Sequence, residues 1–447
     1  MSTELLAPLD LAFWHLESAG HPMHLGALAF FGPAPGARSG EQVLELLAAR
    51  AAAIRRLRMH VRDVLLPVGG AAWSVAKDFD VRRHVHQIRI PDGDFAAGAV
   101  SIAGELMERP LERGLPPWEM YLLTGPEGGG PFAVLVKLHH ALADGMRAVA
   151  IGAGIFDEIV DARTARARRA RAVQPTSWLT GPRQVAGFAR GRIEELGRAV
   201  GVGASVVRAS RLDPRGVPAL SAGSSGTRRL GTAVLDLDDV QRVRKAAGGT
   251  ANDVLLALVA GGMRRWLLAR GEPLPAAGPR ALVPVSRRRP GSPPGSGNKF
   301  SAYLLELPVG DPDPRSRLDS VRTAMDRNKA AGPSRGAGAL AVLADQLPPL
   351  AHRFGAPLAG GAARMLFDVL VTSVPLPRSA LSLGGCPLRE IYPMAPLARG
   401  QSLAIALSTY GGRVHVGLVA DGKAVPDLDR LARSLGEELG ELLTLSP

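Results

Sequence analysis

The sequence predicts a mixed α/β protein built from two units, each a sheet flanked by helices, a pattern that an α+β arrangement also fits. The chain of 447 residues exceeds what one hydrophobic core usually supports, so two units of roughly 150 to 220 residues are expected. Strand-like and helix-like patterns alternate without a repeat period. Strand patterns occur in both halves, as two such units require.

The first part of the chain contains predicted helices at 41–53 and 95–107, and Ser39 is a candidate N-cap for the first. Three runs predict strands: 61–68, 119–125 and 131–138. The last of them, "PFAVLVKL", is apolar except at Lys137, which is typical of a strand buried on both faces. The run "GMRAVAIGAGIF" that follows predicts a helix.

An arginine-rich segment then separates the two units. Between Arg163 and Arg215 there are twelve arginines and three acids, and 183–210 predicts a helix with one basic and one apolar face. Such a helix fits an anionic membrane surface. A linker helix packed on a domain is the more common arrangement and is favoured here.

The last part of the chain again mixes strands, helices and loops. Predicted strands lie at 227–237, 279–286, 300–308, 366–374, 403–410 and 413–421, and predicted helices at 249–271, 314–330, 337–352 and 428–443. A Pro- and Gly-rich loop spans 285–299. The predicted division is therefore 1–160, an interdomain connection at 161–227, and 228–447.

Composition limits the classes of protein. With 46% hydrophobic residues and no apolar run long enough to cross a bilayer, the sequence predicts a soluble protein. The N-terminus has acids where a signal peptide has its apolar segment, and a single cysteine permits no internal disulfide, so a cytoplasmic location is expected. The net charge of +13 suits a polyanion, but an aromatic content of 4% argues against nucleic acid.

The stretch "KLHHALADGM" is the main candidate for chemistry. His139 and His140 end a predicted strand, where successive side chains point to opposite faces, so one is the reagent and the other packs. A neutral imidazole can remove a proton from a hydroxyl. Asp144 is expected to cap the following helix, or to hold an arginine, rather than to act as a triad acid. Gly145 would allow close backbone approach.

Other catalytic signatures are weak. "GPSRG" matches the pattern of a serine hydrolase, but the run before Ser334 is helical where a strand is needed. Cys386 has no activating neighbours and is expected to pack. The sequence contains no P-loop, dinucleotide fingerprint or metal-site motif. Direct attack by a substrate hydroxyl, assisted by a histidine base, therefore remains.

"HHALADG" resembles the HHxxxDG motif of bacterial wax ester synthase/acyl-CoA:diacylglycerol acyltransferases and of peptide-synthetase condensation domains. Further segments are similar to the first of these families. They are "PLDLAFWHLESAGHPMHLGALAFF", "PPWEMYLLTG", "TANDVLLALVAGGMRRWL", "PVSRR…GNKFSAYLLELP" and "LREIYPMAPLARGQSLAIALSTYGG". The resemblance runs from about Pro8 to Leu443.

The chain departs from the family at positions that the family uses near its substrate tunnel. "TSVPLP" stands where serine-asparagine-valine-proline-glycine-proline is usual, so Thr372 keeps a hydroxyl while Ser373 and Leu376 replace asparagine and glycine. Ala404 stands where asparagine is common. Acyl or acceptor preference is expected to change more than fold or reaction.

The resemblance implies two chloramphenicol-acetyltransferase-like domains with a substrate tunnel at their interface. It makes His140 the general base, with His139, Asp144 and Gly145 as supporting residues. The side chains that it suggests for oxyanion binding or for lining the tunnel are Asn252, Thr372, Trp118 and Gln401. Core packing is the competing role for Trp118.

The resemblance further implies acyl-CoA as co-substrate, no permanently bound cofactor or metal, and diacylglycerol or a long-chain alcohol as acceptor. An anionic membrane or lipid-droplet surface would be a peripheral partner, at the inner membrane face or on droplets. Two rivals remain. One is a condensation-type transferase acting on carrier-protein thioesters, and the other is a non-catalytic lipid-binding protein.

Overall fold

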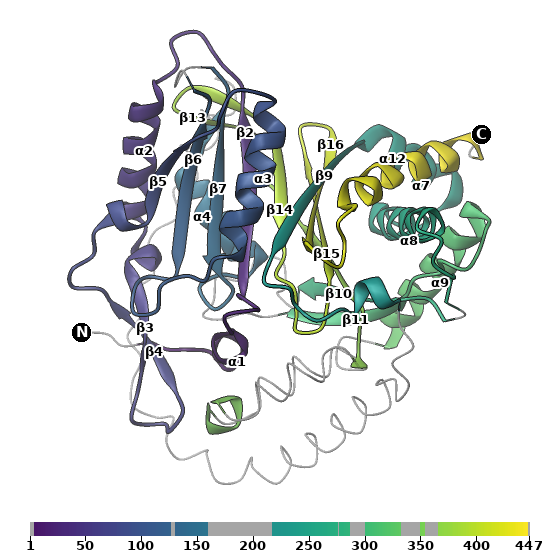
Figure 1. The fold of residues 1–447 in the computed structure, drawn as a ribbon, viewed down its shortest axis with the longest axis horizontal. Coiled ribbons are helices and arrows are strands. Elements are labelled where there is room, and N and C mark those ends of the chain that lie inside the picture. The colour runs from purple at the N-terminus through teal and green to yellow at the C-terminus, as the bar shows by residue number, and fades with distance from the viewer. Residues whose placement is uncertain are drawn as a thin grey trace, which may run out of the picture.

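Two helix-covered sheets lie side by side in the computed structural model of this protein (Figure 1). The structure describes residues 4–126, 130–159, 217–275, 277–286, 300–331, 349–353 and 365–445. The predicted mixed α/β fold with two units is confirmed. The predicted helix at 183–210, most of the loop at 285–299 and most of the helix at 337–352 lie outside the described residues.

The first sheet has seven strands. Their order is β5 (Val85–Arg89), β6 (Trp118–Thr124), β7 (Phe132–His139), β2 (His24–Phe31), β14 (Cys386–Met394), β13 (Ala380–Leu383) and β8 (Asp157–Ile159). One face packs against α2 (Gly40–Ala53) and α4 (Gly145–Ile155), and the other against α3 (Phe95–Glu108). The helix predicted at 41–53 is confirmed together with its cap, because Ser39 and Gln42 form a capping box.

Strands β13 and β14 enter this first sheet from the far end of the chain. β14 pairs antiparallel with β2, placing Tyr392 opposite Leu28. No strand was expected at 380–394, and no local pattern indicates which sheet this segment joins. The two units therefore share strands, and no single cut of the chain separates them.

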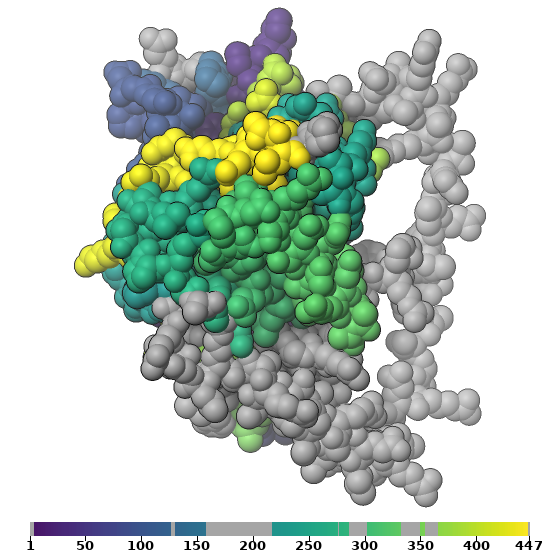
Figure 2. Space-filling view, turned by 90° about the vertical axis from the view of Figure 1, so that its right-hand side faces the viewer, coloured from purple at the N-terminus to yellow at the C-terminus, as the bar shows by residue number. Residues whose placement is uncertain are grey.

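The second sheet has six strands. Their order is β11 (Phe300–Glu306), β10 (Arg280–Ser286), β12 (Val369–Val374), β15 (Leu403–Tyr410), β16 (Arg413–Asp421) and β9 (Arg228–Asp236). One face is covered by α7 (Leu237–Ala247), α8 (Ala251–Ala269), α9 (Pro314–Ala331) and α12 (Leu428–Thr444). Figure 2 shows this helical layer, with α12 in yellow and α9 in green. We call the apolar cluster beneath it the helix-side core.

The opposite face of the second sheet packs against the first unit. Alternate residues of β15 separate the two faces: Leu403 and Ile405 enter the helix-side core, whereas Ala404 contacts residues of the first unit. This second cluster, which we call the interdomain core, also contains Leu28 of β2 and Leu135 of β7. Hydrophobic burial therefore fixes how the two sheets are placed.

Polar contacts at the edge reinforce this interface. The backbone N–H of Arg228 donates to Glu108 of α3 at 2.9 Å, and the Arg228 guanidinium donates to the carbonyl of Gly20 at 3.0 Å. A Cβ on Gly104 of α3 would lie 3.1 Å from the Arg228 carbonyl oxygen, so glycine permits the close approach of α3 to β9.

A small third sheet projects from the first unit beside α1 (Pro8–Leu16) (Figure 1). Its order is β1 (Glu4–Leu5), β4 (Ala71–Val75) and β3 (Met59–Asp63). The strand predicted at 61–68 is wrong beyond Asp63, because residues 64–70 turn back as a loop in which Val64 N–H donates to the Gly70 carbonyl at 3.1 Å. Short 3-10 helices occur at Arg55–Arg58, Val81–Arg83 and Pro218–Leu220. No helix in the described ranges is long and apolar enough to span a bilayer.

Candidate active site

The end of β7 and the start of α4 present the two histidines. His139 is the last residue of β7, and the backbone N–H of His140 donates to the Met23 carbonyl at 2.8 Å. The chain then turns, with Leu142 N–H donating to the His139 carbonyl at 2.8 Å. Asp144 caps α4, as predicted, by accepting from the Arg147 N–H at 2.7 Å.

His140 as a whole residue is partly exposed, although Nδ1 of its ring is buried. It stacks on the Phe13 ring of α1 with centroids 3.9 Å apart and an interplanar angle of 21°. Burial lowers the pKa of His140 to about 4, and nearby His139 adds to the effect, while a hydrogen bond to its own backbone and the charge of Asp144 oppose it. The ring is therefore neutral near neutral pH and can accept a proton.

His139 has a different environment, since its side chain is 1% exposed. Its Nδ1 accepts a hydrogen bond from the Ala141 N–H at 3.0 Å, which places the ring proton on Nε2. That Nε2 lies 3.4 Å from Oε1 of Glu17, and the ring edge contacts Trp14 at a centroid distance of 5.0 Å. His139 is thus held inside the protein while His140 keeps an accessible surface.

Glu17 links several parts of this site. Its side chain is 6% exposed, and its Oε1 also lies 3.4 Å from Nε2 of His24, the residue opposite His139 in the β2–β7 pair. Its Oε2 accepts a hydrogen bond from Arg113 at 2.5 Å. We call Glu17, His24, His139 and Arg113 the Glu17 network.

The charges within the Glu17 network are well defined. Burial raises the pKa of Glu17, but hydrogen bonds to His139 and His24 and the charge of Arg113 outweigh it, so this pKa lies well below its ordinary value. Burial lowers the pKa of His24 to about 4, against the opposing effect of Glu17. A carboxylate therefore faces the neutral ring of His24 and the cation of Arg113. Glu17 and Arg113 were not among the predicted site residues, because they are distant from His139 along the chain and carry no local motif.

Two predicted roles need correction. Trp118 is 0% exposed, donates its indole N–H to the Leu57 carbonyl at 2.6 Å and stacks on His84, so it is a core residue and not a tunnel wall. Gly145 has no positive φ, and a Cβ there would be 3.8 Å from Val374, an ordinary contact. No close backbone approach at Gly145 requires glycine, although the contact brings the start of α4 to β12.

The second unit places the other candidates on different sides of its sheet. Leu370 of β12 packs against the interdomain core, and Thr372 shares its side of the strand, so Thr372 is directed toward the first unit. Asn252 lies in the first turn of α8, within the helical layer on the opposite face. Gln401 is buried before β15, where its Nε2 donates to the Phe367 carbonyl at 3.0 Å.

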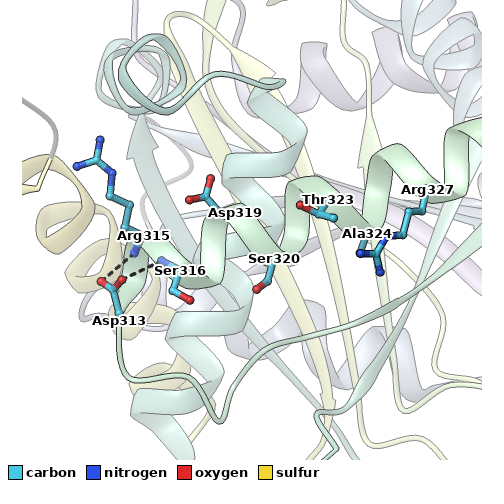
Figure 3. Close-up of a pocket in the computed structure, with 8 residues that line it drawn as sticks. All are labelled: Asp313, Arg315, Ser316, Asp319, Ser320, Thr323, Ala324 and Arg327. Carbon is cyan, nitrogen blue, oxygen red and sulfur yellow. Dashed lines mark hydrogen bonds between the residues drawn. The ribbon is translucent and has the colours of Figure 1, made fainter.

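The remaining features do not contribute to this site. Ser334 lies outside the described residues, and Cys386 packs in the core of the first unit, as predicted. A groove of about 540 Å³ runs along α9 (Figure 3), where Asp313 accepts from the backbone N–H groups of Arg315 and Ser316. Its acids and arginines alternate on a helix of the outer layer, so it belongs to the surface of the second unit.

Comparison with known proteins gives matches along nearly the whole chain. Residues 6–255 match the wax ester synthase/diacylglycerol acyltransferase catalytic domain, and residues 296–443 match the WS/DGAT C-terminal domain. The probable diacylglycerol O-acyltransferase tgs1 of Mycobacterium tuberculosis (strain H37Rv) is 31% identical over 465 residues, covering 99% of this chain and 96% of the relative. The corresponding tgs2 is 29% identical, covering 98% of each chain.

Solved structures agree on the fold. The wax ester synthase/diacylglycerol acyltransferase of Marinobacter aquaeolei VT8 is similar with a TM-score of 0.73 and 22% identity, covering 99% of both chains. The first condensation domain of the CDA synthetase gives a TM-score of 0.59 at 17% identity, covering 98% of this chain and 96% of that one. These likenesses confirm the predicted chloramphenicol-acetyltransferase-like architecture.

Proposed function

We propose a reaction for this chain from one premise: it belongs to the wax ester synthase/diacylglycerol acyltransferase family and is an acyltransferase. The reaction is transfer of a fatty acyl group from acyl-CoA to the free hydroxyl of diacylglycerol, giving triacylglycerol and CoA. A long-chain alcohol would give a wax ester by the same step. The names of the relatives support diacylglycerol as the first acceptor to test.

The neutral imidazole of His140, a residue that is only partly buried, carries this proposal. Its Nδ1 is a buried atom, so we assign the basic role to the other ring nitrogen. Nε2 is then the basic nitrogen. Stacking on Phe13 fixes the plane of the ring.

The step conserves atoms and charge. Nε2 of His140 takes the hydroxyl proton as the alcohol oxygen bonds to the thioester carbon, giving a tetrahedral oxyanion. This intermediate collapses with cleavage of the carbon–sulfur bond, and the imidazolium returns its proton to the CoA thiolate. No acyl-enzyme forms. The placement of Thr372 on the side of β12 that faces the first unit favours its hydroxyl over Asn252 as an oxyanion donor.

The test uses the purified full chain with acyl-CoA and dispersed diacylglycerol. Wild-type protein should release CoA thiol and form triacylglycerol, and His140→Ala should lose at least about 10²-fold in kcat while remaining folded. His86→Ala on β5, another partly exposed histidine, is the matched control and should keep its activity.

Equal turnover by His140→Ala and wild type would remove His140 from the reaction. Long-chain alcohol supplied in place of diacylglycerol measures the wax ester activity. If neither acceptor releases CoA from acyl-CoA, transfer from carrier-protein thioesters or lipid binding without catalysis becomes the better description.

A further inference from the structure

The loop at the tip of the β3–β4 hairpin exposes apolar side chains. Leu65 is 93% exposed, Leu66 79% and Val68 59%, the three highest values among the exposed large hydrophobic residues that the structure describes. Scattered exposed leucines are common, whereas a group on one projecting loop indicates an interaction site. The hairpin leaves the first unit beside α1 and points away from the second unit (Figure 1).

A fourth apolar residue extends this group. Leu350, which is 44% exposed, packs beside the loop: a Cβ on Gly69 would lie 2.9 Å from the Cα of Leu350. Gly69 has a φ of +79°, so both its conformation and this close approach require glycine. We call Leu65, Leu66, Val68 and Leu350 the hairpin-tip surface.

The charge next to the hairpin-tip surface is positive. From Arg55 to Gly70 the chain has four arginines and one acid, Asp63. Asp63 lies 3.8 Å from the Arg353 guanidinium, which compensates its charge. Arg62 is exposed on β3 next to this loop, whereas Arg58 is exposed in the 3-10 helix that precedes the hairpin. An apolar tip with basic flanks is the combination that binds anionic lipid surfaces, because apolar groups enter the acyl region while cations meet the headgroups.

The hairpin-tip surface is also connected to the reactive histidine by α1. Burial lowers the pKa of His15 near the end of α1, and the backbone of Gly69, next to Val68, raises it, so the loop lies close to this helix. Two residues earlier in the same helix, Phe13 stacks on the ring of His140 at 3.9 Å. A lipid surface that bound the tip would therefore lie on the α1 side of the molecule, where His140 is presented.

We propose that the hairpin-tip surface inserts into an anionic phospholipid surface and holds the α1 side of the active site against it. This rests on the proposed function in one respect, that a lipid acceptor must reach His140 from a surface. Because the leucines contact water in the free protein, replacing them should leave the fold intact. Their loss should weaken membrane binding by about tenfold or more for each leucine.

The experiment measures flotation of the full chain with vesicles of phosphatidylcholine, with and without phosphatidylglycerol. Wild-type protein should bind both, and more tightly with phosphatidylglycerol. The double variant Leu65→Asp/Leu66→Asp should lose binding to both. Leu268→Asp near the end of α8, where the side chain is 52% exposed, introduces the same change on the other unit and should bind like wild type.

Arg62→Gln should weaken binding only to vesicles with phosphatidylglycerol. The proposal is wrong if the double variant floats like wild type, if wild type does not bind vesicles, or if the double variant instead converts a dimer to a monomer in solution. The last outcome would assign the surface to a second copy of the chain. Because flotation needs no turnover, its result does not depend on whether the proposed reaction is correct. Acyl transfer to a short-chain, monomeric acceptor should be unchanged in the double variant. If the double variant loses this activity but still binds vesicles, the two leucines act on the active site and not on membrane binding.

Discussion

Replacing Glu17 by glutamine is the sharpest perturbation of the Glu17 network. The side chain keeps its shape, so one carbonyl oxygen can still face His139 and His24, both 3.4 Å away. In the wild-type protein the Arg113 guanidinium lies 2.5 Å from Oε2 of Glu17. In the variant an NH2 group takes the place of this oxygen and faces the guanidinium. The substitution therefore sets two hydrogen-bond donors against each other, and their repulsion should displace the side chain at position 17.

The size of the expected loss in stability depends on how exposed Arg113 is. The Arg113 side chain is 48% exposed and stacks on the Trp14 ring at 3.7 Å, so water can solvate it when the carboxylate is gone. The pair itself should contribute only about 1 kcal/mol. The buried amide at position 17 makes poorer hydrogen bonds than the carboxylate, which adds a loss of similar size. The free energy of unfolding should therefore fall by about 1–3 kcal/mol.

A larger effect is expected on catalysis. The Met23 N–H donates to Glu17 at 3.4 Å, and the Met23 carbonyl accepts from the His140 N–H at 2.8 Å, so the network positions the base through one residue. Displacement of a reacting group by about 1 Å can cost about 10²-fold, and we expect kcat to fall by about 10- to 100-fold. The KM for acyl-CoA should change little, because Glu17 is buried and its partners are His24, His139 and Arg113.

The assay is steady-state release of CoA thiol, with urea unfolding of the same preparations. Arg113→Gln is the matched control: it leaves the Glu17 carboxylate beside the histidines and should lower kcat less. If Glu17→Gln loses stability but keeps the wild-type kcat, Glu17 only supports the fold and the positioning argument fails.

Two further predictions concern stability. Asp144→Ala should lower the free energy of unfolding by about 1 kcal/mol by removing the cap of α4, whereas Asp144→Asn, which can still cap, should stay within about 0.5 kcal/mol; equal losses in urea unfolding would contradict the capping role. The folded-state pKa of His24, about 4, lies below its ordinary value of 6.5, so the unfolded chain binds more protons between these values and stability falls as pH drops through this window. Between about pH 7 and about pH 5 the loss from His24 should be about 2 kcal/mol, and His24→Asn should flatten the dependence seen in urea unfolding at the two pH values; an unchanged slope would mean that His24 is not kept neutral by burial.

Local sequence determined the elements that depend on neighbours in the chain. The helices at Gly40–Ala53, Phe95–Glu108 and Leu428–Thr444 lie within a residue of their predicted bounds, because apolar periodicity and caps are local properties. The same holds for the cap at Asp144. The strand predicted at 61–68 failed beyond Asp63 because its apolar residues Leu65, Leu66 and Val68 lie exposed in a loop and not in the core.

Tertiary structure alone decided which of the two histidines is enclosed, since that depends on Glu17 and Trp14, which reach His139 from a distant part of the chain. It also decided that Trp118 packs in the core, that Thr372 and Asn252 lie on opposite sides of a sheet, and that β14 joins the first unit. The reason is physical: a residue's type and neighbours set its chemistry and its local conformation, whereas burial and pairing are set by contacts between segments far apart in sequence, whose energies no local pattern contains.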